Sequence, residues 1–282
     1  MNRKWTCLMA ALALVLGVVF SSGCQKLRAR DQLNKGVQAF RNARYTTAVE
    51  HFKTAVELDP TFKTARLYLG MAYYQQYIPG AESPENQQML AAAKEQFLEV
   101  LRNDPNDTVA IASMASANYN ETQGIASLKE KLKKLDEARD WYQRLGRVDP
   151  KNKEAFYTLG VITWAKWYPI LQQARNSLGM RQEDPGPLKD KKLREELRAT
   201  YWDMINEGIG SLDHALELDP RYDEAMAYLN LLYRERADLA ATAEEYRADI
   251  AQADAWLQKT LDTRKEKANL PATTMPAGGG AR

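Results

Sequence analysis

The feature that most constrains the fold of this sequence is a helical segment ending in Asp-Pro that recurs along the chain. In the first copy, residues 32–60, one helical face collects the following side chains at regular spacing: Tyr45, Ala48, Phe52 and Ala55. Proline ends such a helix because it lacks an amide proton and biases the preceding residue away from helix. The stops follow one another at intervals of 45, 45 and 70 residues: Pro60, Pro105, Pro150 and Pro220. Self-similarity of this kind predicts a solenoid of stacked helix pairs.

Three positions keep their character from one copy to the next. A small residue stands in the first helix of four pairs, with asparagine in the last: Gly36, Gly70, Ala115, Gly160 and Asn230. A second small residue stands where the two helices are expected to cross: Ala48, Ala93, Ala138, Gly208 and Ala253. A large residue follows it: Phe52, Phe97, Tyr142, Leu212 and Leu257. Small residues let two backbones approach closely, and the large residue is expected to fill the groove beside them.

This pattern resembles the tetratricopeptide repeat, a helix pair of about 34 residues. The resemblance implies an all-α fold, a right-handed α-solenoid of about five helix pairs over residues 32–267. It departs from the family in two ways, since the early aromatic of the first helix is mostly missing and Lys265 replaces the last proline. It also implies a protein-binding scaffold or assembly factor rather than an enzyme.

The fourth pair carries an insertion at about residues 165–190, which includes Trp167 and the segment RQEDPGP. Insertions in solenoids often lie on the binding face, so the segment is either a lid over a groove or an inert excursion. From Leu188 onward a long helix is expected to resume. The last residues, 268–282, are small and lack periodicity, and we expect them to be disordered.

The first 23 residues have the features of a secretory leader. Arg3 and Lys4 precede an uncharged apolar run over residues 8–20, which is short for a membrane-spanning helix. The following Ser-Ser-Gly-Cys resembles the lipobox of bacterial lipoproteins, although Ser21 stands where leucine is commonest. The resemblance implies that Cys24 is lipidated and joined to the first repeat by a short tether, residues 24–31. The alternative is an ordinary leader with a chance cysteine.

A lipidated cysteine implies a membrane-anchored lipoprotein facing the periplasm. Gln25 follows Cys24, and under the sorting rule of such lipoproteins a residue other than aspartate there implies the outer membrane. Removal of residues 1–23 leaves 37 basic and 37 acidic residues, so no nucleic-acid partner is expected. The expected partner is a protein or peptide of the cell envelope.

No residue pattern in the sequence indicates an enzyme, a metal site or a cofactor. The two histidines, His51 and His214, stand in different repeats, whereas metal sites need clustered ligands. Neither a glycine-rich phosphate loop nor a Gly-x-Ser-x-Gly motif opens any helix.

A column of large side chains lies four residues after each small residue: Phe40, Tyr74, Tyr119, Trp164 and Arg234. In tetratricopeptide arrays such positions face the concave groove, and aromatic and arginine side chains are favoured anchors there. Trp164 and Trp167, beside the insertion, are the strongest individual candidates. The column either binds a protein partner, binds a glycan or other small ligand, or packs between neighbouring first helices.

Overall fold

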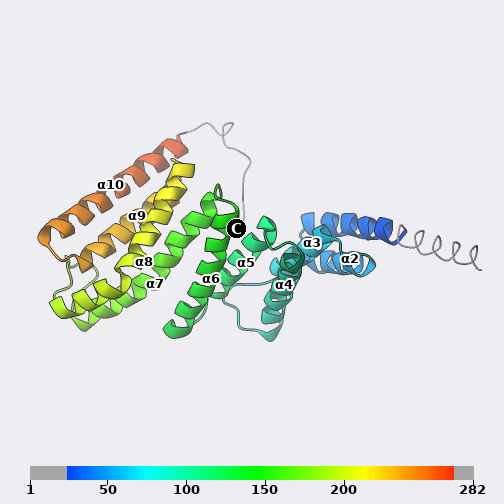
Figure 1. Cartoon of the computed structure of the whole chain (residues 1–282), viewed down its shortest axis with the longest axis horizontal. Coiled ribbons are helices and arrows are strands. Elements are labelled where there is room, and N and C mark those ends of the chain that lie inside the picture. The colour runs from blue at the N-terminus through cyan, green and yellow to red at the C-terminus, as the bar shows by residue number, and fades with distance from the viewer. Residues whose placement is uncertain (1–23, 270–282) are drawn as a thin grey trace, which may run out of the picture. The chain divides into compact units, whose positions relative to one another are not determined.

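The computed structural model describes residues 24–269, which are helical apart from turns, loops and one 3₁₀ segment and contain no strand. Figure 1 shows these helices, coloured from the N-terminal to the C-terminal end of the chain. The predicted leader, residues 1–23, and all but the first two residues of the predicted tail lie outside the described residues. Among the helices that are described, none is long and apolar enough to cross a membrane.

The described residues form two compact units that divide between Lys134 and Leu135. Unit 1 contains a helix over residues 24–41 and then, in order: α2 (Tyr45–Leu58), α3 (Lys63–Tyr74), α4 (Pro84–Asn103), α5 (Thr108–Glu121) and the start of α6 (Leu128–Val148). Unit 2 contains the rest of α6 and then: α7 (Lys153–Ser177), α8 (Lys191–Leu218), α9 (Asp223–Arg236), the 3₁₀ turn η1 (Ala237–Leu239) and α10 (Ala243–Ala268). In each unit, helices consecutive in the chain pack against one another.

The Asp-Pro stops end the second helix of four pairs, as the sequence predicts. The aspartate of each stop directly follows the last residue of α2, α4, α6 or α8. The next helix then begins within a few residues, and a side chain caps it in two of the four cases, α5 and α7. Asp107, for example, accepts a hydrogen bond from the Ala110 amide at 2.9 Å. Such a cap satisfies one of the amide groups left unpaired at a helix start.

The predicted contact between small and large residues is confirmed within three pairs. A β-carbon added to Gly70 would lie 2.6 Å from the Phe97 ring, and one added to Gly160 would lie 2.6 Å from a methyl of Leu212. The ring of Phe52 occupies the same place beside Gly36. These large side chains are fully buried, so each glycine marks a place where the facing helix carries its core residue.

The last pair differs from this prediction. Asn230 takes the place of glycine and donates a hydrogen bond to the Ala253 carbonyl at 2.7 Å. Ala253 is buried as expected, but Leu257 is 43% exposed. The prediction that Leu257 fills the groove is therefore wrong, and in this pair a hydrogen bond from Asn230 to the backbone of α10 stands in place of the glycine contact of the earlier pairs.

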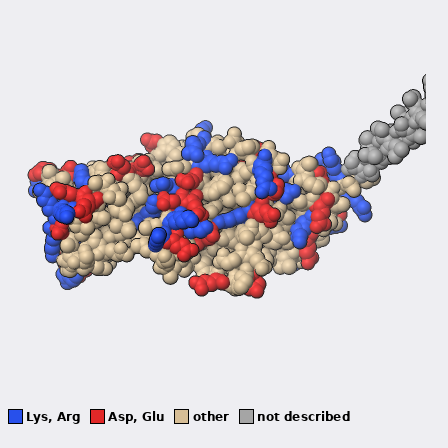
Figure 2. Space-filling view, turned by 60° about the horizontal axis from the view of Figure 1, so that its bottom comes forward, with Lys and Arg blue, Asp and Glu red and all other residues tan. Residues whose placement is uncertain are grey.

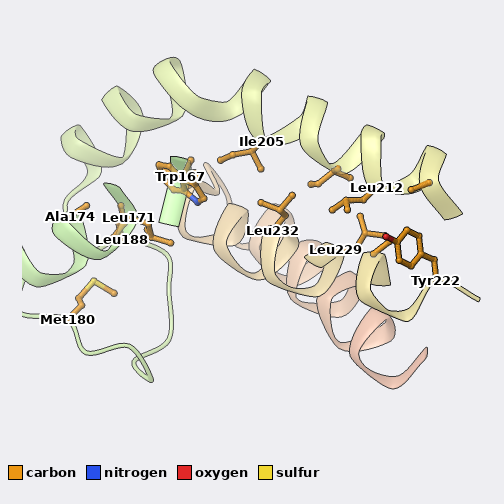
Figure 3. Packing of buried hydrophobic residues seen from close by; sticks show 14 residues of the cluster. Trp167, Leu171, Ala174, Met180, Leu188, Ile205, Leu212, Tyr222, Leu229 and Leu232 are labelled. Carbon is orange, nitrogen blue, oxygen red and sulfur yellow. The ribbon is translucent and has the colours of Figure 1, made fainter. Parts of the chain in front are cut away.

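Two predicted segments take a different form in the structure. Residues 24–31, expected to be a tether, are helical and continuous with the first helix of unit 1. Within the insertion, α7 continues through Pro169 as far as Ser177, and only residues 178–190 leave the helix. The longer α8 then covers this extension, and Figure 3 shows the resulting core around Trp167, Leu171 and Leu188.

Candidate binding cavity

A cavity of about 610 Å³ lies within unit 2, among α7, α9, α10 and the loop over residues 178–190. It falls in the size range of pockets that hold small molecules or single anchoring side chains, about 300–1,000 Å³. Its apolar lining comes from Leu171, Leu231 and Ile250. The remaining walls are aromatic or charged and are described in turn below.

One wall is an aromatic stack on α7. The rings of Trp164 and Tyr168, one helical turn apart, stack at 5.0 Å with an interplanar angle of 24°. Tyr228 of α9 meets the Trp164 ring edge to face at 5.7 Å. Because three aromatic rings support one another, Trp164 is held in one orientation at the cavity wall.

Glu235 of α9 contributes a buried carboxyl group to the cavity. Its Oε1 accepts a hydrogen bond from the Trp164 indole nitrogen at 2.9 Å, whereas its Oε2 is buried and has no hydrogen-bond partner. Burial raises the pKa of Glu235 to about 8; the indole hydrogen bond opposes this rise and the nearby charge of Asp238 adds to it. A carboxyl of this kind is neutral at pH 7 unless a ligand supplies a positive charge.

A buried ion pair closes another side of the cavity. Arg175 of α7 donates to Asp238 of η1 at 2.5 Å, and both side chains are buried. Arg175 also donates to the backbone carbonyls of Arg181, at 2.8 Å, and Asp184. The Nε of Arg175 is buried and has no hydrogen-bond partner. Arg175 thus fastens the loop to α7 and to η1 at once.

The loop over residues 178–190 forms a wall of the cavity. Residues 182–186 line it, and the Leu188 amide donates to the Asp238 carbonyl at 3.0 Å. The Leu188 carbonyl in turn accepts from Arg194 at 2.7 Å. A β-carbon on Gly186 would lie 3.2 Å from both Asp238 Cγ and the Tyr246 ring, so the loop lies tightly against its neighbours. The loop is thus a packed wall of the cavity, and its role as a lid stays a prediction.

Two of the predicted groove residues meet at this cavity. Trp164 and Arg234 both line it, although they lie 70 residues apart in the sequence. Arg234 is exposed and pairs with Asp254 at 2.6 Å. Trp167 does not take part, since it is fully buried and its ring lies 5.3 Å from Tyr201 of α8. The prediction that Trp167 contacts a partner is therefore wrong, since Trp167 belongs to the core of unit 2.

The other groove candidates lie in unit 1 and are half-buried. Phe40 meets the rings of Tyr45 and Tyr68 edge to face, and the Tyr74 hydroxyl accepts a hydrogen bond from Asn120 at 2.6 Å. Tyr119 is half-buried on α5. Phe40 and Tyr74 thus pack between neighbouring helices, which is the alternative that the sequence left open.

The histidines and the cysteine stand apart from the cavity. His51 pairs with Gln32 at 2.8 Å, and His214 pairs with Glu217 at 2.8 Å. The part of the chain that the structure describes contains no group of His, Cys, Asp and Glu side chains suited to a metal ion. Cys24, the first described residue, is exposed and carries a free thiol.

Sequence reasoning missed Glu235 and Arg175. Glu235 directly follows Arg234 in a helix rich in charged residues, and Arg175 lies inside the insertion. Both side chains line a cavity that the loop over residues 178–190 helps to enclose, and no periodicity in the sequence indicates that loop. The one feature of the sequence that could have indicated Glu235 is its position next to Arg234, a member of the predicted column of groove residues.

Consecutive helices pack in pairs, and in three pairs a glycine of one helix faces a large buried side chain of the other. These features define the class of fold: the chain has the all-α fold of a tetratricopeptide-type solenoid. No protein-family model and no curated protein matches the sequence. Among solved structures, a crystal structure of a MamA protein is similar, with 15% identity and a TM-score of 0.55, over 88% of this chain and 98% of that chain. MamA 41-end from Desulfovibrio magneticus RS-1 is similar with 14% identity and a TM-score of 0.54, over 85% and 97%.

A third structure is TTC0263, described as a thermophilic tetratricopeptide protein of Thermus thermophilus. It shares 18% identity over 85% of this chain and 97% of that chain, with a TM-score of 0.44. At that score the likeness has no bearing on the fold, whereas the MamA structures support it. At these identities, the MamA likeness concerns the fold alone.

Proposed function

We propose that this chain is a membrane-anchored lipoprotein that acts as a protein–protein interaction scaffold or assembly factor in the bacterial cell envelope. The observation that carries the binding role is the cavity of unit 2, where Trp164 and Arg234 meet. Aromatic and arginine side chains at a concave site are favoured anchors for a partner because they bury much area at little entropic cost.

The anchor is proposed from the sequence around Cys24. The thiol is exposed at the first described residue, where lipid attachment would not disturb the packing of unit 1. Each buried CH₂ group of a lipid chain contributes about 0.8 kcal/mol, and stable anchoring needs more than one chain. Lipoproteins of this kind place the modified cysteine at the start of the mature chain, and Gln25 favours the outer membrane.

The scaffold role is tested by crosslinking in the native envelope. A photoreactive amino acid in place of Arg234, which is exposed at the cavity, is expected to capture a discrete protein. The same amino acid in place of Glu217, which is exposed on α8 and does not line the cavity, serves as control. Equal capture from both positions, or none from position 234, contradicts the proposal.

The anchor is tested separately. Cys24→Ser is expected to move the protein from the membrane fraction to the soluble fraction, and mass spectrometry of the parent protein should show lipid on Cys24. A parent protein that is soluble, or whose mature N-terminus carries an unmodified thiol, refutes the anchor and leaves the binding role untouched.

A further inference from the structure

We propose that the cavity of unit 2 takes a basic side chain of the partner polypeptide, a lysine ammonium or an arginine guanidinium, on the carboxyl group of Glu235 beneath the Trp164–Tyr168 stack. The inference rests on the proposed function, since it names the chemistry by which the scaffold would hold its partner. Three features of the cavity carry it.

The first feature is the imbalance of charge around the cavity. Four acidic residues line it, Glu183, Asp184, Glu235 and Asp238, against two basic ones, Arg175 and Arg234. Both basic residues already have partners, in Asp238 and Asp254. Glu183 and Asp184 pair with Arg181, outside the cavity. Glu235 is the one lining carboxyl without a basic partner among the described residues, so a positive charge entering the cavity would stabilise its ionised form.

The second feature is the unused hydrogen-bonding capacity of Glu235. One carboxyl oxygen accepts from Trp164, while the other is buried and accepts nothing. Buried polar atoms are nearly always paired, and an exception at a cavity calls for an explanation. An ammonium or guanidinium group supplies a donor of the required charge.

The third feature is the match between the walls and a lysine or arginine stem. Trp164 and Tyr168 line the cavity with aromatic rings, to which cations are attracted. Leu171, Leu231 and Ile250 provide apolar surface for the methylene groups of the side chain. A volume of about 610 Å³ accommodates one long side chain together with neighbouring backbone. An anionic ligand would instead oppose the ionisation of Glu235 and would meet the other acidic side chains that line the cavity.

Binding is expected to depend on pH through Glu235. The free carboxyl, with a pKa of about 8, must lose a proton to pair with a cation, so affinity should rise as pH increases from about 6.5 to 8.5. The charged and titratable groups that surround it are these: Arg175 and Tyr168 of α7, Glu183 and Asp184 of the loop, Arg234 of α9, Asp238 of η1 and Tyr246 of α10.

The test measures binding of a capped pentapeptide, Ala-Ala-Lys-Ala-Ala, to the whole chain by calorimetry and by Trp fluorescence. The matched probe replaces lysine with norleucine, which keeps the stem and removes the charge. The lysine peptide is expected to bind about tenfold more tightly or better, and Glu235→Gln should abolish that preference. Glu224→Gln, an exposed glutamate of the same helix that does not line the cavity, should leave it unchanged.

Equal binding of the two peptides by the parent protein overturns the inference, whatever the variants do. Tighter binding of a neutral oligosaccharide than of the lysine peptide also overturns it, in favour of a glycan site. Near-UV circular dichroism establishes that Glu235→Gln is folded, and the comparison of two peptides on the parent protein does not require that variant.

The peptide-binding test and the crosslinking test of the proposed function can fail independently of each other. A crosslinked partner in the envelope without any lysine preference overturns this inference alone. A lysine preference without a crosslinked partner supports the cavity chemistry and overturns the scaffold role.

Discussion

Glu235→Gln tests the energetics of the cavity without any ligand. Glutamine keeps the oxygen that accepts from Trp164 but cannot ionise, so it mimics the neutral carboxyl. In the parent protein, burial raises the pKa of Glu235 from 4.5 to about 8. The folded state therefore keeps this proton up to a higher pH than the unfolded state does.

The sign and size of the effect follow from proton linkage. Because the unfolded state releases the proton first, stability falls as pH rises from about 4.5 to about 8 and then levels off. At 1.36 kcal/mol for each tenfold change in proton affinity, the full loss is on the order of 5 kcal/mol, with about 3 kcal/mol lost by pH 7. The variant should lack this slope and be the more stable protein at pH 8.5.

The assay can isolate unit 2. Every tryptophan of the described residues lies in this unit: Trp141, Trp164, Trp167, Trp202 and Trp256. In a chain that lacks residues 1–23, and with them Trp5, urea unfolding followed by tryptophan fluorescence therefore reports on unit 2. The measurement is made at several pH values between about 5 and 8.5. Its slope and midpoint give the free energy of unfolding.

The comparison between the two proteins removes contributions from other groups. Asp213 and Asp238 also have pKa values raised by burial, but they are present in both proteins. Asp219 and Asp223 have lowered pKa values, so their contribution is lost as pH falls below about 4, outside the window. Parallel stability profiles for parent and variant would refute the claim that Glu235 is buried and neutral.

Three further predictions concern stability. Gly160→Ala should destabilise unit 2 by about 1–3 kcal/mol through overlap with the facing leucine, whereas Gly210→Ala, with open space around it, should stabilise the same unit by up to about 1 kcal/mol; equal effects in urea unfolding would contradict the packing argument. Gly179→Ala should lower the free energy of unfolding by about 1–2 kcal/mol, because Gly179 has a positive φ. Gly124→Ala should lower it by more, since Gly124 has a positive φ and also lies against the backbone of Gly80. Thermal unfolding followed by circular dichroism measures both effects. Asp107→Ala should destabilise unit 1 by about 1 kcal/mol at pH 7, because it removes the cap of α5. Burial would raise the pKa of Asp107, but Lys63 and a backbone amide outweigh it and lower this pKa, so the difference should shrink below about pH 4 as the parent carboxylate takes up its proton. An undiminished difference at about pH 2 would show that the charge of Asp107 is irrelevant.

The pairing of helices was predictable because it depends on contacts of fixed local type. The crossing of two helices depends on the sizes of single residues, a small one such as Gly70 against a large one such as Phe97. The Asp-Pro stops mark the ends of the pairs in which they occur. The apolar stripe of α8 was predictable for the same reason, since its leucines recur at helical spacing and pack against the core of unit 2.

The cavity was only half predictable. Trp164 and Arg234 emerged from the repeat, but Trp167 was misplaced because sequence does not tell which side of an extended helix its neighbour will cover. The cavity that Glu235 lines has an irregular loop as one wall, and the side chain that fastens this loop, Arg175, looks ordinary in the sequence. Figure 2 shows acidic and basic side chains interspersed on the face in view. In the sequence, Glu235 stands between Arg234 and Arg236, and nothing in that run of charges indicates that its carboxyl is buried.

The exchange of glycine for Asn230 in the last pair has a consequence for the substitutions that α10 accepts. The Asn230 amide contacts α10 through the backbone carbonyl of Ala253, a group that every residue type offers. Leu257 and Leu261 are exposed on the same helix, so changes at these two positions should be tolerated. The fully buried side chains that face a glycine in the earlier pairs leave far less freedom: Phe52, Phe97 and Leu212.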